Sequence, residues 1–240
     1  QNPDLMINLS ASPFDYDHDE DRKEVIRLNV KKYKLPMIYC NAVGAQTEIV
    51  FDGGSLVCAD NAVIAAEMKY FEEDYLLVDT EKLAGQQGTS DATGQHLMTA
   101  DMRVAKTDDP DTIIAYLTKE NNIAQVKAAL VLGIRDYFSK MGFTKAILGS
   151  SGGIDSAVVL TLAVEALGKD NVTAVLMPSG FSSSHSVDDA VTLSQQLGNP
   201  YHVVPIQPVY EAILGSLDPL FSGTAFGLAE ENIQSRSRGN

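Results

Sequence analysis

The chain has 240 residues, of which 45% are hydrophobic and 21% charged, and its formal net charge is −14. This length and apolar content are enough for two packed domains, whereas the negative charge opposes binding to nucleic acid or to an anionic membrane surface. Two cysteines do not make a disulfide framework, and neither a signal-peptide pattern nor an apolar run of membrane-spanning length is present. We therefore expect a cytoplasmic globular protein.

The first part of the chain contains short apolar segments with strand character, at residues 5–14, 35–46 and 56–59. Cys40 and Cys58 each lie in such a segment. We interpret both as buried, inert thiols, because unpaired cysteines in apolar strands are usually core residues.

An acidic run at residues 15–21 contains His18. Carboxylates beside a histidine suggest a metal site, but a charged loop entering a helix that starts near Arg22 explains the run better, because acidic residues stabilise helix N-termini. We favour the charged loop.

A polar segment separates two unlike halves. Residues 81–110 lose apolar periodicity and are rich in Gly, Gln, Thr, Asp and Ser, which is typical of an exposed linker. We expect a first domain over residues 1–84, a linker over 85–110 and a second domain over 111–240.

The second half alternates helix and strand. Helical spacing at residues 112–117 and 123–138 leads to a strand at 145–148, a helix at 157–164 and further strands at 172–179 and 201–206. This order predicts a parallel sheet with right-handed crossovers and helices on both faces. Ligands of such sheets bind at the carboxyl ends of the strands.

The loop between the first of these strands and its helix is suited to phosphate. Its glycines let backbone N–H groups approach an anion, and the helix N-terminus adds partial positive charge. Asp155 is placed to hold Mg²⁺ beside such an anion. The sequence has neither a GxxxxGK[ST] run nor a GxGxxG run after a strand, so two common phosphate loops are excluded.

Residues 151–156, SGGIDS, resemble the SGGxDS signature of the ATP pyrophosphatases, which cleave ATP between its α and β phosphates. Residues 230–240 resemble the ENxQxRxRG segment of glutamine-dependent NAD synthetases. Segments of the first half resemble the nitrilase-like amidase domain of the same family, and they lie at residues 5–14, 35–46, 50–55 and 71–74.

This resemblance implies an α/β fold class: the C-terminal half of a nitrilase-like α-β-β-α domain, followed by a Rossmann-like parallel-sheet ATP-pyrophosphatase domain that is incomplete at its C-terminus. The implied reaction is amidation of nicotinic acid adenine dinucleotide to NAD through an acyl adenylate. It uses ATP and Mg²⁺, with ammonia that the complete enzyme releases from glutamine. Family members are usually homo-oligomers.

The resemblance also implies site residues. Asn232 and Arg236 would bind the dinucleotide substrate, Ser12 and His18 would bind glutamine, and Asp155 would hold the metal. His18 replaces the basic residue usual at that position, and its partial charge at neutral pH weakens this assignment. The residues implied for ATP are Gly149, Ser150, Ser151, Gly152, Gly153, Ile154, Asp155, Ser156 and Met177.

No residue of the chain is assigned to glutaminase catalysis. In the family the glutamate, lysine and cysteine of that site lie upstream of the segment that begins here, and neither Cys40 nor Cys58 can replace the nucleophile. We therefore expect an internal fragment.

Two alternatives stay open. One is another ATP pyrophosphatase, such as a GMP or asparagine synthetase, and the other is a non-catalytic nucleotide-binding module. Among single residues, Arg236 or Arg238 is a candidate cation for ATP, and His185 is interpreted as a surface position in the first turn of a helix.

Overall fold

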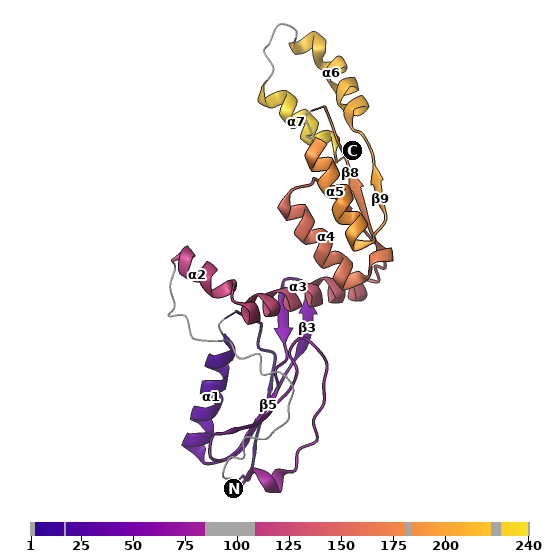
Figure 1. The fold of residues 1–240 in the computed structure, drawn as a ribbon. Coiled ribbons are helices and arrows are strands. Elements are labelled where there is room, and N and C mark those ends of the chain that lie inside the picture. The colour runs from indigo at the N-terminus through magenta and orange to yellow at the C-terminus, as the bar shows by residue number, and fades with distance from the viewer. Residues whose placement is uncertain (1–2, 17, 85–108, 181–183, 222–226, 240) are drawn as a thin grey trace. The chain divides into compact units, whose positions relative to one another are not determined.

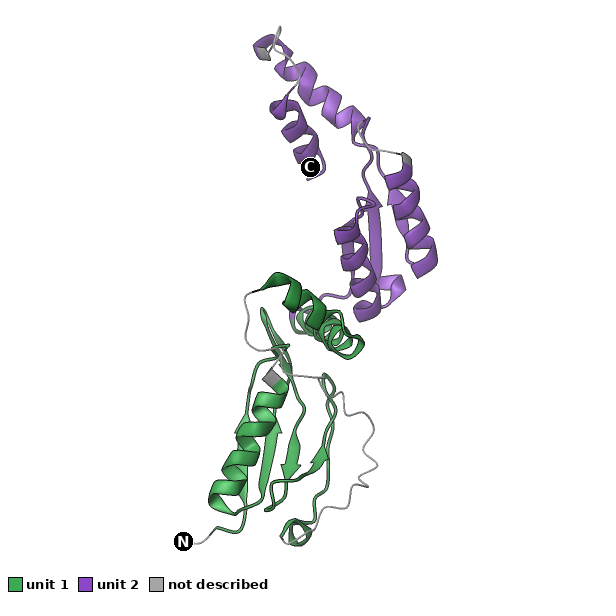
Figure 2. Ribbon diagram, turned by 60° about the vertical axis from the view of Figure 1, so that its left-hand side comes forward, with its two compact units in different colours: residues 1–140 green, residues 141–240 purple. Residues whose placement is uncertain are grey.

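The computed structural model describes residues 3–16, 18–84, 109–180, 184–221 and 227–239. The chain forms two compact units, Gln1–Lys140 and Met141–Asn240 (Figure 2). Within the described residues, no helix is long and apolar enough to cross a membrane.

The first unit contains a four-stranded sheet with the order β1-β2-β5-β6. Its strands are β1 (Met6–Ser10), β2 (Met37–Asn41), β5 (Leu56–Cys58) and β6 (Ile64–Glu67). Strand β1 pairs with β2 in parallel, and the other pairs are antiparallel. Helix α1 (His18–Tyr33) joins the two parallel strands and lies along the sheet (Figure 1). The helix begins at His18, earlier than the expected start near Arg22.

Helix α1 covers one face of this sheet. Ile26 and Val30 pack against Met37, Tyr39 and other side chains that alternate along the strands. Cys58 belongs to this core and is fully buried, as expected. Cys40 is exposed, so its expected burial was wrong. It follows Tyr39 and therefore points to the opposite face of the sheet, because strand side chains alternate.

A second layer of the first unit joins a hairpin to a long helix. The hairpin strands are β3 (Val43–Gln46) and β4 (Ile49–Asp52), and the helix is α3 (Glu120–Met141). Ala129 and Leu132 of α3 pack with Phe71, Val43 and Val50. The Asp136 carboxylate also accepts a 2.7 Å hydrogen bond from the backbone N–H of Ala45. Two short helices complete the unit, α2 (Pro110–Leu117) and η1 (Thr80–Leu83).

The second unit contains a parallel three-stranded sheet with the order β7-β8-β9. The strands are β7 (Ala146–Gly149), β8 (Val172–Leu176) and β9 (Tyr201–Val203). Helix α4 (Ile154–Leu167) and the short helix η2 (Lys169–Asn171) connect the first pair, and α5 (Ser184–Leu197) connects the second pair. Helices α6 (Gln207–Phe221) and α7 (Leu228–Ser237) follow. The expected parallel sheet is confirmed.

Helices α4 and α5 cover the same face of this sheet. Leu160 of α4 and Ala190 of α5 share one core with Val172, Ala174 and Leu176 of β8. Because the strand order runs in one direction, two right-handed crossovers lie on the same side. The sequence predicted helices on both faces of the sheet, and these two helices share one of them.

The two compact units divide the chain after Lys140, so α2 and α3 pack with the first unit. The sequence placed both helices in a second domain that starts at residue 111. The residues of the expected linker lie almost entirely outside the described part, so those domain limits stay a prediction.

Candidate phosphate-loop site

The loop of the second unit joins β7 to α4 at the carboxyl end of the sheet. The backbone N–H of Ser150 donates to the Val175 carbonyl at 2.9 Å, which extends the pairing of β7 with β8 by one residue. Gly153 is the N-cap of α4, and no side chain caps the helix there. The first N–H groups of α4 are therefore available to a ligand, as at other anion-binding helix N-termini.

Two serine hydroxyls organise the loop from inside. The Ser151 and Ser156 hydroxyls lie 3.0 Å apart. The Ser156 hydroxyl also accepts a 3.2 Å hydrogen bond from the N–H of Ser151, and the Ser151 hydroxyl accepts one of 3.2 Å from the N–H of Gly153. These bonds hold the loop in a defined shape before any anion arrives.

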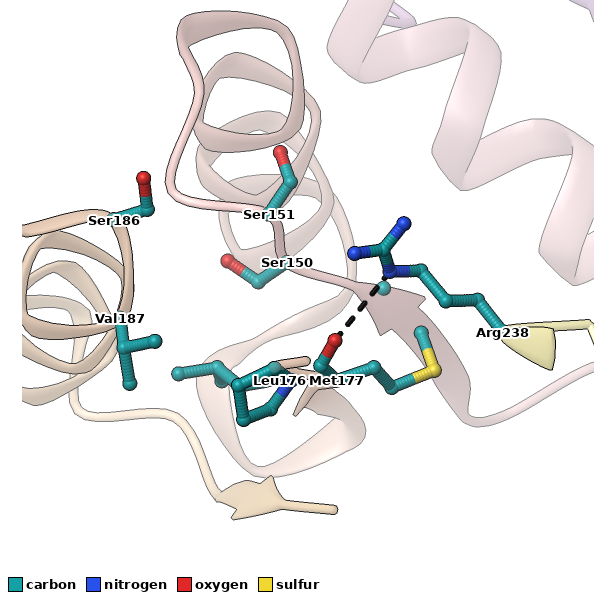
Figure 3. Close-up of a pocket in the computed structure, with 9 residues that line it drawn as sticks. Ser150, Ser151, Leu176, Met177, Ser186, Val187 and Arg238 are labelled. Carbon is teal, nitrogen blue, oxygen red and sulfur yellow. Dashed lines mark hydrogen bonds between the residues drawn. The ribbon is translucent and has the colours of Figure 1, made fainter. Parts of the chain in front are cut away.

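A cavity of about 250 Å³ opens beside this loop (Figure 3). Its walls combine the end of β7, the end of β8, the first turn of α5 and one residue that follows α7. The lining residues are Gly149, Ser150, Ser151, Leu176, Met177, Pro178, Ser186, Val187 and Arg238. Small-molecule sites usually measure roughly 300–1,000 Å³, so this cavity suits part of a nucleotide.

Several residues expected to bind ATP meet at this place. Gly149, Ser150, Ser151 and Met177 line the cavity, and residues 152–156 form the rest of the loop and the first turn of α4. His185 is exposed in the first turn of α5, as expected.

The residues expected to bind the dinucleotide lie elsewhere on α7. Asn232 and Arg236 are exposed, and neither is among the residues that line the cavity. Arg238 does line the cavity, and its Nε atom donates a hydrogen bond to the Met177 carbonyl at 3.4 Å. The sequence favoured Arg236 for a role in binding the dinucleotide and left either arginine open as a cation for ATP.

The expected glutamine residue Ser12 belongs to a buried polar network in the first unit. Its N–H donates to the Asn41 Oδ1 atom at 2.8 Å. Asn41 donates in turn to the Asp52 carboxylate at 3.0 Å, and Arg22 binds both oxygens of that carboxylate at 3.0 and 3.1 Å. The side chain of His18, the other expected glutamine residue, lies outside the described part. The structure therefore shows what holds Ser12 but does not test the pair.

Burial perturbs the charged groups of this network. Burial raises the pKa of Asp52, although the Arg22 guanidinium acts in the opposite direction. For Arg22, burial lowers the pKa, but the charge and hydrogen bonds of Asp52 outweigh it and the pKa is raised overall. The pair is thus held in a poorly solvated place where each charge depends on the other.

A second buried cluster was not expected from the sequence. The Lys23 Nζ atom lies 2.7 Å from the Asp19 carboxylate and 2.8 Å from that of Glu67. The Tyr70 hydroxyl donates to Asp19 at 2.6 Å and also contacts Glu67. The spacing of Asp19 and Lys23, four residues apart on a helix, was the available signal, but it did not indicate burial.

Comparison with known proteins identifies relatives over the whole chain. Residues 126–240 match the family model for NAD synthase. The chain is 41% identical over 240 residues to the glutamine-dependent NAD(+) synthetase of Synechocystis sp., covering all of this chain and 39% of that protein. It is 36% identical over 246 residues to the enzyme of the same name from Thermotoga maritima, covering 98% of this chain and 42% of that protein.

One solved structure is similar to this chain in both fold and sequence. The glutamine-dependent NAD+ synthetase of Acinetobacter baumannii, in complex with ADP, superposes with a TM-score of 0.78 at 30% identity. The match covers 99% of this chain and 41% of the Acinetobacter chain. The chain thus spans about two fifths of the length of the relatives that it matches.

The parallel sheet, with a glycine-rich loop and a cavity at the carboxyl ends of its strands, defines the second unit as an α/β domain of the kind that binds ligands at this edge. The relatives reported above are glutamine-dependent NAD(+) synthetases. The chain is a homologue of the glutamine-dependent NAD(+) synthetases, and its residues 126–240 match the NAD synthase domain.

Proposed function

We propose that this chain carries the ATP-binding part of a ligase that amidates nicotinic acid adenine dinucleotide to NAD. The observation that carries the proposal is the loop of residues 150–153, which sits between a parallel strand and an uncapped helix N-terminus and borders a cavity. Phosphate groups are the ligands that such a loop holds best. The ADP bound to the Acinetobacter relative supports the same assignment.

In the proposed reaction, a carboxylate oxygen of the acid dinucleotide attacks the α phosphorus of ATP. The bond to the bridging oxygen breaks, and pyrophosphate leaves with that electron pair. Ammonia then attacks the acyl carbonyl and displaces AMP, which gives the amide. The N–H groups of the first turn of α4 would stabilise the charge that develops on pyrophosphate, because they are already oriented at the uncapped N-terminus of the helix.

Mg²⁺ fits the residues present. Asp155 is an exposed carboxylate in the first turn of α4, directly after the loop. The described residues contain no group of three or more acidic, cysteine or histidine side chains that would form an all-protein metal site. Mg²⁺ usually binds one or two carboxylates together with substrate phosphates and water. We propose that Asp155 supplies such a ligand, and that the ion neutralises charge on the phosphates when it is bound.

Glutamine is the proposed nitrogen source of the longer protein, with Ser12 and His18 as its proposed contacts. The support is the resemblance of their segment to the amidase domain, together with the network that fixes the N–H of Ser12. Ser12 and His18 both belong to the first unit, whereas the loop proposed for ATP lies in the second, so this part of the proposal is tested apart from ATP binding.

The first test is ATP binding by the purified chain in the presence of Mg²⁺, measured by isothermal titration calorimetry. Release of pyrophosphate and AMP is then measured with the acid dinucleotide and either ammonium or glutamine. Saturable ATP binding together with dinucleotide-dependent pyrophosphate release supports the ligase. Binding without release favours a nucleotide-binding module, and the absence of ATP binding contradicts the proposal.

A further inference from the structure

Helix α7 presents two opposite faces. Residues four apart on a helix lie on the same side, and residues two apart are separated by about 200°. Gln234 and Arg238 therefore share one side, and Asn232 and Arg236 share the other. The residues of the motif that resembles a single substrate-binding segment therefore lie on two opposite sides of the helix.

The face with Gln234 and Arg238 is attached to the end of β8. The Gln234 side-chain amide donates to the Ser179 hydroxyl, and the Arg238 Nε atom donates to the Met177 carbonyl at 3.4 Å. Both acceptors lie within three residues of Leu176, the last residue of β8. Figure 3 shows the Arg238 side chain reaching over Met177 with its guanidinium on the same side as the loop serines.

The charge of the cavity singles out Arg238. ATP is a polyanion, and the chain has a formal net charge of −14, so the site needs local positive charge to hold it. Among the described residues that line the cavity, Arg238 is the one with a charged side chain. It is also exposed, so a ligand can reach it. An arginine guanidinium binds phosphate oxygens through two parallel N–H groups, which a point charge does not.

We infer that Arg238 binds the phosphates of ATP and that Gln234 positions α7 against β8 so that Arg238 can do so. This inference rests on the proposed binding of ATP. It assigns to the nucleotide a helix face that the sequence motif attributes to the other substrate. Asn232 and Arg236 remain on the opposite, exposed face, and these are the residues for which the family resemblance implies contacts with the dinucleotide.

The matched pair Arg238→Ala and Arg236→Ala tests this inference in the full chain, because the two arginines belong to the same segment and both are exposed. ATP and adenosine are titrated separately by calorimetry with Mg²⁺ present. We expect Arg238→Ala to weaken ATP binding by roughly tenfold to a hundredfold, as for loss of a hydrogen bond to a charged group. Adenosine binding, and ATP binding by Arg236→Ala, should each stay within about twofold of the wild type.

Two further variants separate binding from positioning. Arg238→Lys keeps the charge but loses the paired N–H groups, so its ATP affinity should fall between those of the wild type and Arg238→Ala. Gln234→Ala should weaken ATP binding, and hydrogen exchange of the α7 amides should increase, because the helix is released from Ser179. Circular dichroism verifies that each variant is folded.

The outcomes are distinct. If wild-type chain does not bind ATP, the proposed function fails. If it binds ATP and Arg238→Ala binds equally well, or if both arginine variants lose affinity equally, the inference about Arg238 is overturned while the proposed function stands. An equal loss of adenosine and ATP affinity in Arg238→Ala would place the contact on the nucleoside and also overturn the inference. Unchanged α7 exchange and ATP affinity in Gln234→Ala would overturn the positioning role.

Discussion

Gly152 and Ser186 approach so closely that a Cβ atom built on the glycine would lie 2.0 Å from the Ser186 carbonyl oxygen. The glycine also has a φ of +80°, a conformation that side chains disfavour. The phosphate loop therefore rests directly on the first turn of α5. A side chain at this position must move either the loop or the helix.

We predict that Gly152→Ala weakens ATP binding by at least about tenfold, because a displaced loop no longer aims its N–H groups at one anion. Gly142→Ala is the matched control, since Gly142 has a φ of +72° and a Cβ atom added to it would meet no described atom within 4 Å. Both variants should lose about 1–2 kcal/mol of stability from backbone strain, with a further loss in Gly152→Ala from the clash with Ser186, and only Gly152→Ala should lose affinity. Calorimetry and urea unfolding measure the two effects, and equal losses of affinity would contradict the prediction.

We predict that Asp52→Ala destabilises the first unit by about 3–5 kcal/mol, because it leaves the buried Arg22 guanidinium without its partner. Glu72→Ala is the control. Its salt bridge with Lys69 is exposed, so its removal should change the unfolding free energy by less than about 1 kcal/mol. Urea unfolding followed by circular dichroism measures both, and similar small losses would show that burial of the Arg22 pair has little effect.

We predict that the buried Tyr70 hydroxyl makes the free energy of unfolding depend on pH in the alkaline range. Burial, and then the charges of Asp19 and Glu67, raise the pKa of Tyr70 above its ordinary value of 10.0. The folded state thus keeps this proton at a pH where the unfolded state releases it. Stability is present in full below pH 10 and should fall above it, by up to about 1.4 kcal/mol per pH unit for one group.

Tyr70→Phe tests this dependence. It should cost about 1–3 kcal/mol at neutral pH, because the buried Asp19 carboxylate loses its hydroxyl donor, and it should flatten the fall in stability above pH 10 relative to the wild type. Tyr33→Phe is the control, since Tyr33 is 53% exposed. Urea unfolding between pH 8 and 11 measures the slopes, and an unchanged slope in Tyr70→Phe would refute the assignment.

We predict that Asp155→Ala reduces ATP affinity in the presence of Mg²⁺ and has little effect when the ion is removed with a chelator. The reason is that the carboxylate acts on the phosphates through the ion. Asp170→Ala controls for the loss of one negative charge, because Asp170 lies in η2 of the same unit and is exposed. Unchanged affinity in Asp155→Ala with Mg²⁺ would count against its role as a metal ligand.

The sequence was sufficient for features that depend on local pattern. The spacing of apolar residues predicted strand β7, helix α4 and helix α3, and the glycines and serines predicted the loop between the first two. These features follow from backbone geometry and periodicity within a few neighbouring residues. The resemblance of short motifs to one family was likewise supported by relatives that match the whole chain.

Features set by distant contacts were missed. Cys40 is exposed because no described helix covers its side of the sheet, which the strand sequence does not reveal. Asp19 was expected in a charged loop before a helix, but it lies within α1 and is buried with Lys23 beside Glu67 and Tyr70. Which arginine of the segment lines the cavity depends on the position of α7 against the end of β8, and two hydrogen bonds made across the fold accompany that position.

The sequence family and the packing assign helix α3 to different parts of the molecule. The NAD synthase family model begins at residue 126, inside the helix, yet Ala129 and Leu132 are buried against Phe71 of the first unit. A piece cut at the family boundary would divide the helix and uncover these side chains. Anyone wishing to express the second unit alone should begin after Lys140, where the compact units divide, and should leave α3 with the sheet that it protects.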